Sequence, residues 1–275
     1  MPKPASSLIF RASGALVGLA VGRSLALGGG PDGGLALARI LAEELAEGRR
    51  DLRELAHRWV ARHQADPSDI DPETAAALAH LGRHDAPPSR AAGSGSDPLV
   101  RALPVALAAF DTPRTLVSAS YHIAALTHPE PLVAWSAVAV NVALARFLQA
   151  KRDFVPDVIE ALRSNEVPDV LLAAVRRVPL PAAALPEGPA PALALSDAEA
   201  VLRLAYHEPV LDRGLRAIAE PGVAAANRAG LAGALFGARD GIGAIPGAWT
   251  ARVDRAILES LAGRLVRVAS AAAPG

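Results

Sequence analysis

Cysteine is missing from all 275 residues of this chain. Its absence excludes a disulfide framework, a thiol nucleophile and a zinc site built on cysteine ligands. Aromatic residues are scarce as well, at 4% of the chain. Alanine, leucine and valine must therefore fill the core, and this composition favours helices over sheets. Lysine occurs only at Lys3 and Lys151, and the prevailing arginine, alanine and proline are typical of a GC-rich bacterial genome.

The chain also lacks a net charge, because its 28 basic residues balance its 28 acidic residues. A neutral chain that is 51% hydrophobic is neither a disordered polymer nor, by composition, a binder of nucleic acid. The most apolar stretch near the start, residues 12–22, is shorter than the ~20 residues that cross a bilayer. We therefore expect a cytoplasmic protein without a membrane span. A cleaved signal peptide is the alternative interpretation of this stretch.

Helical periodicity recurs along the chain, and no stretch shows the alternation of a β-strand. Asp51, Asp97 and Thr112 are expected to begin helices, and Pro104 should kink or split one. Five prolines within residues 178–195 predict an extended strap, and the capping-box pattern from Ser196 predicts that a helix begins after it. The expected architecture is a single all-α domain over residues 1–275, with this Pro-rich strap at about 178–195.

Two glycine stripes lie near opposite ends of the chain. Each stripe falls on one helix face, since its glycines are three or four residues apart. Glycine inside a helix costs about 1 kcal/mol relative to alanine, so such a stripe makes sense where another backbone approaches closely. We expect the two stripes to belong to two central helices in contact. Their glycines are Gly14, Gly18 and Gly22 in the first, and Gly230, Gly233 and Gly237 in the second.

Three segments contain residue types that could bind an anion or a metal ion. The glycine-rich residues 28–34 lack the Lys-Ser/Thr of a phosphate-binding loop, so they predict a flexible turn, with an anion-binding nest as the alternative. Residues 93–97, Gly-Ser-Gly-Ser-Asp, precede a helix, where backbone amides and hydroxyls suit a phosphate; a plain loop that ends in a cap is the alternative. His80 and His84 lie one turn apart but lack a third metal ligand, which favours a solvated helix end.

Four sequence segments together resemble those of the ADP-ribosylglycohydrolases, the family of dinitrogenase reductase-activating glycohydrolase. They occur in the family's order: GALVGLAVG near the start, GSGSDPLVRALPVAL, THPEP at 127–131, and AGLAGALFGARDGIGAIPGAW at 229–249. The resemblance implies an all-α fold. It also implies hydrolysis of ADP-ribosyl bonds to arginine or serine, with two magnesium ions.

The chain departs from the family at the metal ligands. The family's TDDT motif falls on residues 28–31, which hold three glycines and a proline, and Arg23 stands where the family's first helix ends in Gly-Asp. The aspartates of the family's GDTDT motif fall on Pro221 and Val223. The Glu-bearing loop between the first two motifs is missing as well. Magnesium needs hard oxygen ligands, which these side chains do not offer.

These departures predict a pseudoenzyme, without metal or catalytic residues, that acts as a binding or structural protein. At most a weak ADP-ribosyl or nucleotide ligand is expected, and Asp97 would face its phosphates with a negative charge. The alternative is a hydrolase with a rebuilt site, for which Asp32, Asp97 and Glu220 are the candidates. The residues implied in ligand binding are Gly93, Ser94, Gly95, Ser96 and Asp97.

Overall fold

The computed structural model describes residues 4–91, 93–181, 192–219 and 221–272. Within these ranges the chain is helical and holds no β-strand, which confirms the all-α prediction. The helices are α1 (Pro4–Leu27), α2 (Gly33–Ala46), α3 (Leu52–Ala65), α4 (Pro72–His84), α5 (Asp97–Ala102), α6 (Pro104–Ala108), α7 (Pro113–Ala125), α8 (Pro131–Leu148), α9 (Val155–Arg163), α10 (Asp169–Arg177), α11 (Leu193–His207), α12 (Leu211–Ile218), α13 (Val223–Asp240), the 3₁₀ helix η2 (Ile242–Ala244), α14 (Gly247–Thr250) and α15 (Arg255–Ala272).

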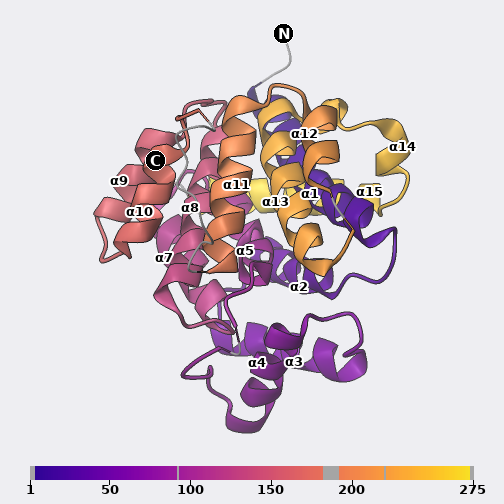
Figure 1. Ribbon diagram of the computed structural model, residues 1–275. Coiled ribbons are helices and arrows are strands. Elements are labelled where there is room, and N and C mark those ends of the chain that lie inside the picture. The colour runs from indigo at the N-terminus through magenta and orange to yellow at the C-terminus, as the bar shows by residue number, and fades with distance from the viewer. Residues whose placement is uncertain (1–3, 92, 182–191, 220, 273–275) are drawn as a thin grey trace.

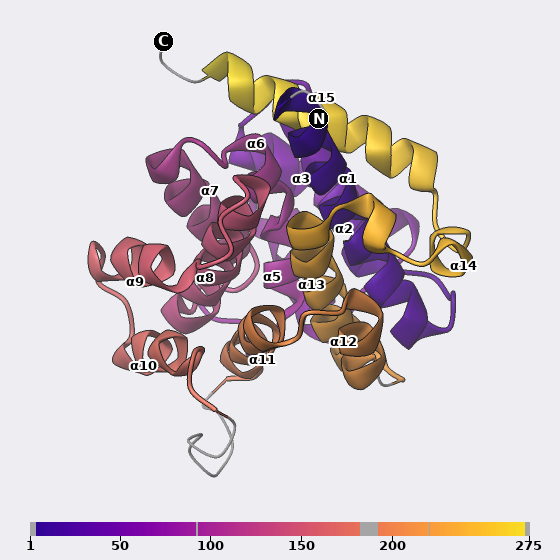
Figure 2. The same ribbon diagram turned by 90° about the horizontal axis from the view of Figure 1, so that it is seen from above.

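Helices α1 and α13 lie side by side at the centre of the fold (Figures 1 and 2). They touch along both glycine stripes, as the sequence predicted. A Cβ atom added at Gly18 would overlap the carbonyl group of Gly233, and one added at Gly14 would overlap that of Gly237. Only glycine permits so close a contact between two backbones. The stripes thus join the two ends of the chain into one core.

Helix α8 is the other main core helix, and it packs against both α11 and α13 (Figure 2). Both α1 and α8 are long and apolar enough to cross a membrane, with mean hydropathies of 1.4 and 1.6. Their most apolar windows are nevertheless 72% and 89% buried inside the protein. Packing against other helices therefore accounts for their hydrophobicity.

Helices α3 and α4 form a hairpin that projects at the lower end of the molecule in Figure 1. Trp59 anchors this hairpin: it is fully buried, and its indole nitrogen donates a hydrogen bond to the carbonyl of Leu37 at 3.0 Å. The guanidinium of Arg101 lies over the Trp59 ring, 5.4 Å from its centroid. These contacts set the start of α4 directly against α5.

Most predicted helix starts agree with the structure. Asp51 caps α3 through its side chain, and Pro104 separates α5 from α6. The predicted helix start at Ser196 is wrong. Helix α11 begins at Leu193, because the amide of Leu193 bonds to Ser94 Oγ and that of Ala194 to the Ser94 carbonyl. Of the predicted strap, residues 182–191 lie outside the described residues.

Candidate functional site

Arg23, on α1, is the centre of a buried polar network where α1, α2, α5 and α13 meet. Its side chain is only 3% exposed. The guanidinium pairs with Asp32 at 2.6 Å and donates a hydrogen bond to the Asn227 carboxamide on α13. Arg23 Nη2 and Asp97 Oδ1 both lie close to Gly34, since a Cβ atom added to this glycine would be 2.6 Å from each of them. Arg23 and Asp97 therefore face each other beside Gly34. Burial by itself lowers the pKa of Arg23, but Asp32 and Asp97 raise it overall.

Asp32 holds this arginine from the N-terminus of α2. Its carboxylate caps the helix by accepting the Leu35 amide at 2.9 Å and accepts from Arg23 Nε at 2.8 Å. The side chain is 13% exposed and lines a pocket of about 340 Å³ between the end of α1, the first turns of α2 and the start of α15. Asp32 therefore connects the buried network to the surface.

Asp97, at the start of α5, has a second cationic partner. Asp97 Oδ2 forms an ion pair with Arg101 and accepts a hydrogen bond from Thr74 Oγ1 at 3.1 Å. Burial alone would raise the pKa of Asp97, but Arg101 and Arg23 together lower it. The expectation that Asp97 faces a ligand's phosphates does not fit this geometry, because the carboxylate is buried between two arginines.

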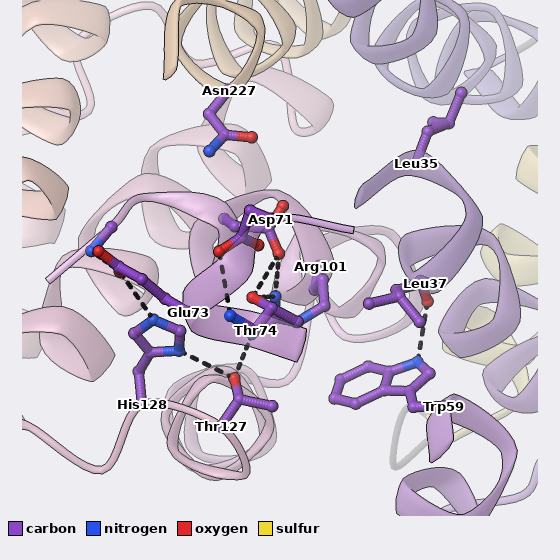
Figure 3. Close-up of polar contacts among 12 residues, drawn as sticks. Leu35, Leu37, Trp59, Asp71, Glu73, Thr74, Arg101, Thr127, His128 and Asn227 are labelled. Carbon is purple, nitrogen blue, oxygen red and sulfur yellow. Dashed lines mark hydrogen bonds and ion pairs between the residues drawn. The ribbon is translucent and has the colours of Figure 1, made fainter. Parts of the chain in front are cut away.

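Asp71 adds a further carboxyl group at the N-terminus of α4 (Figure 3). Its Oδ1 caps α4 through the Thr74 amide at 3.0 Å, whereas its Oδ2 is buried without a hydrogen-bond partner. Burial raises the pKa of Asp71, and the nearby Asp97 carboxylate raises it further. The pKa values of the two aspartates are thus shifted in opposite directions.

The sequence-predicted loop 93–97 has most of its polar side chains engaged inside the protein. Ser94 Oγ accepts from the start of α11, and Ser96 Oγ donates to Asp197 at 2.5 Å. The amide of Gly95 donates to Glu73 Oε2 at 2.9 Å. Gly93 also lies against Glu73, because a Cβ atom added at Gly93 would overlap the Glu73 carboxyl group. The loop therefore holds a carboxylate, but one that belongs to the chain itself.

The imidazole of His128 lies against the carboxylate of Glu73 (Figure 3). Its Nε2 lies 3.4 Å from Glu73 Oε2, and its Nδ1 lies 3.1 Å from Thr127 Oγ1. Thr127 in turn accepts a hydrogen bond from Arg101. Burial lowers the pKa of His128, and the neighbouring Arg101 cation lowers it further. The imidazole is consequently neutral near pH 7 and links Arg101 to Glu73.

Sequence reasoning found part of this site. It named Asp32 and Asp97, and the structure brings both to Arg23. Glu220, the third candidate of the rebuilt site, lies outside the described residues. Asp71, Glu73 and Thr74 were missed, because they follow the pattern of an ordinary helix start. Their approach to α5 depends on the packing of the α3–α4 hairpin.

A family model for the ADP-ribosylglycohydrolases matches residues 32–274. This chain belongs to the ADP-ribosylglycohydrolase family. A solved structure titled "ADP-ribosylglycohydrolase-related protein complex" superposes with a TM-score of 0.78 at 24% sequence identity, over 96% of this chain and 99% of that chain. This similarity shows the shared fold. A comparison with curated proteins found no match.

The resemblance places the family's two metal motifs on two segments that the structure describes in part. The first lies in the turn between α1 and α2, where Gly28 and Gly29 have positive φ angles of 63° and 82°. The second lies at the start of α13, where the Gly222 amide donates to the Ala26 carbonyl at 3.2 Å. The C-terminal end of α1 therefore lies against the start of α13.

The residues around Arg23 do not fit the two magnesium ions of the family. Asp32 and Asp97 are the nearest carboxylates, and arginines already neutralise both. Magnesium requires near-octahedral oxygen ligands at about 2.1 Å, and a guanidinium contributes none. Within the described ranges, no group of three or more His, Asp or Glu side chains is arranged to hold a metal ion.

Proposed function

We propose that this ADP-ribosylglycohydrolase family member is a pseudoenzyme that lacks dimetal hydrolase activity and acts as a binding or structural protein. The observation that carries the proposal is the buried Arg23 guanidinium, which pairs with Asp32 at 2.6 Å and faces Asp97. A fixed cation thus stands among the carboxylates that a divalent cation would need.

The charge balance of the network supports this proposal. Two guanidinium groups, those of Arg23 and Arg101, face two carboxylates, those of Asp32 and Asp97. In these two ion pairs the charges are therefore balanced without any metal. A magnesium ion would leave two excess positive charges in a buried site, where Coulomb repulsion is screened far less than in water. Removing Arg23 to admit the metal would break a buried ion pair, which costs roughly 3–5 kcal/mol.

A hydrolase with a rebuilt site is the second candidate, and the position of Asp32 favours it. Asp32 lines the pocket between α1, α2 and α15, together with Ser24, Arg252 and Asp254. Ser24 Oγ is buried there without a hydrogen-bond partner. An acidic side chain and an unsatisfied hydroxyl in the same pocket are a starting point for a general base or a ligand contact.

An activity assay distinguishes the two candidates. The purified chain is incubated with ADP-ribosylarginine and ADP-ribosylserine peptides, with and without magnesium, and released ADP-ribose is quantified. The proposal expects no release above that of the heat-denatured protein. Release that Asp32→Ala abolishes, but that the surface variant Asp169→Ala on α10 retains, would establish the rebuilt hydrolase instead. The magnesium dependence of that release would show whether the metal chemistry persists.

A further inference from the structure

The carboxylate of Glu73 lies within the curve of the glycine loop that precedes α5. Its Oε2 accepts a hydrogen bond from the Gly95 amide at 2.9 Å, and His128 Nε2 lies 3.4 Å from the same oxygen. A side chain at Gly93 would collide with this carboxyl group. The position of the glycines, the amide and the imidazole thus defines a cradle of carboxylate size.

A chain of hydrogen bonds from Arg101 through Thr127 orients His128 so that its imidazole donates a hydrogen bond to Glu73. The Arg101 guanidinium can only donate, so Thr127 Oγ1 accepts from it. The hydroxyl hydrogen of Thr127 is then free to point at His128 Nδ1, 3.1 Å away. A neutral imidazole that accepts at Nδ1 carries its proton on Nε2. Both the His128 Nε2–H and the Gly95 N–H therefore point at the same carboxylate oxygen of Glu73. Figure 3 shows the contact between His128 and Glu73.

Glu73 is held in the cradle by these contacts alone among the described residues. No lysine or arginine there forms an ion pair with it, and its side chain is 35% exposed. The residue projects from the first turn of α4, on the α3–α4 hairpin. A carboxylate that is partly open to solvent and has no arginine or lysine partner leaves its position at low cost, by a change of side-chain rotamer.

We propose that Glu73 is an internal ligand that occupies an anion-binding site formed by Gly93, Gly95 and His128. An external oxyanion, such as a phosphate or carboxylate group, binds there only when Glu73 leaves. The contact is autoinhibitory, because the chain's own carboxylate excludes competing anions both by filling the cradle and by charge repulsion. The inference does not depend on the loss of the metal centre, since none of the three residues pairs with Arg23 or Asp32.

Chemical rescue of Glu73→Ala tests this proposal. The variant leaves the cradle empty, so acetate or inorganic phosphate should bind in place of the missing carboxylate. We expect each anion to raise the Tm of Glu73→Ala beyond the effect of sodium chloride at equal ionic strength. The apparent phosphate affinity should exceed that of the wild type by about tenfold or more, equivalent to ~1.4 kcal/mol. A larger response to acetate than to phosphate would identify a carboxylate site, and the reverse a phosphate site.

Two controls make the outcome specific. Glu54→Ala removes an exposed glutamate from the same hairpin and should give no anion response. The double variant Glu73→Ala/His128→Ala should lose the response, because one of the two donors is gone. The proposal is overturned if Glu73→Ala responds to acetate and phosphate no more than the wild type does.

The variant Glu73→Gln keeps the proposal testable if Glu73→Ala does not fold. Its carboxamide oxygen preserves the bond from Gly95 but carries no charge, so phosphate should compete with it more easily than with the native carboxylate. Equal phosphate binding by Glu73→Gln and by the wild type would contradict the proposal.

Discussion

Gly18 on α1 and Gly233 on α13 meet backbone to backbone. A Cβ added to either residue would overlap the carbonyl group of the other. The obstacle on each side is main chain rather than the end of a flexible side chain, so neither helix can yield without moving as a whole. The contact binds the two ends of the sequence together and also places Arg23, on the next turn of α1, opposite Asn227.

Gly233→Ala should lower the free energy of unfolding. Overpacking a core typically costs about 1–3 kcal/mol, and here the new methyl group meets a carbonyl. Helix propensity alone predicts a gain of about 1 kcal/mol, so the two effects have opposite signs. Gly263→Ala, in α15, is the matched control because its Cβ would meet nothing closer than Arg267 at 3.6 Å. Urea midpoints that rise for both variants would contradict the close contact.

Arg23→Ala should destabilise the fold by roughly 3–5 kcal/mol, since it leaves buried carboxylates without their cation. The control is Arg255→Ala, which breaks an exposed pair with Glu259 whose side chains are 52% and 36% exposed. That change should cost under about 0.5 kcal/mol. Denaturant unfolding of both variants checks the prediction. A loss as small for Arg23 as for Arg255 would mean that the buried network contributes nothing to stability.

The wild-type protein should show no dinuclear binding of Mn²⁺, because Arg23 occupies the position between the carboxylates. Isothermal titration or the electron paramagnetic resonance signal of free Mn²⁺ measures this. Arg23→Asp is the informative variant: it replaces the cation with a third carboxylate beside Asp32 and Asp97, and should gain measurable Mn²⁺ affinity. Two sites of micromolar affinity in the wild type would refute the prediction.

Asp71→Asn should stabilise the protein at pH 7. The folded state raises the pKa of Asp71, so the native protein retains a proton that the unfolded chain releases above about pH 3.9. That contribution to stability is present in acid and is lost as the pH rises through the folded pKa. Asparagine keeps the helix cap without the buried charge, and the gain over wild type should therefore grow from pH 3.5 to pH 7.

The control for this experiment is Asp51→Asn, which changes the exposed cap of α3. Its effect should stay within about 0.5 kcal/mol at both pH values. Urea unfolding at pH 3.5 and pH 7 gives the comparison. An Asp71→Asn gain that shrinks toward neutral pH would mean that the folded state does not raise the pKa of Asp71.

The sequence by itself determined the helical architecture and its central pair. The apolar spacing predicts the helices because a 3.6-residue period is a local property. The glycine stripes predict the contact of α1 with α13 because repeated glycines inside a helix are costly unless a backbone approaches. The resemblance aligns the family's metal motifs with residues 28–31, Pro221 and Val223, whose side chains carry no oxygen ligand, and it therefore predicts that the metal ligands are missing.

Only the tertiary structure decided which side chains face one another. Asp71, Glu73 and Thr74 have the sequence pattern of an ordinary helix start. They lie next to α5 because Trp59 of the α3–α4 hairpin packs against Leu37 and Arg101. Ser196 matches a helix cap, but the Ser94 contacts start α11 earlier. Long-range polar partners leave no periodic signal in the chain. Whether a charged group is paired, and with which partner, is therefore set by the packing of distant segments.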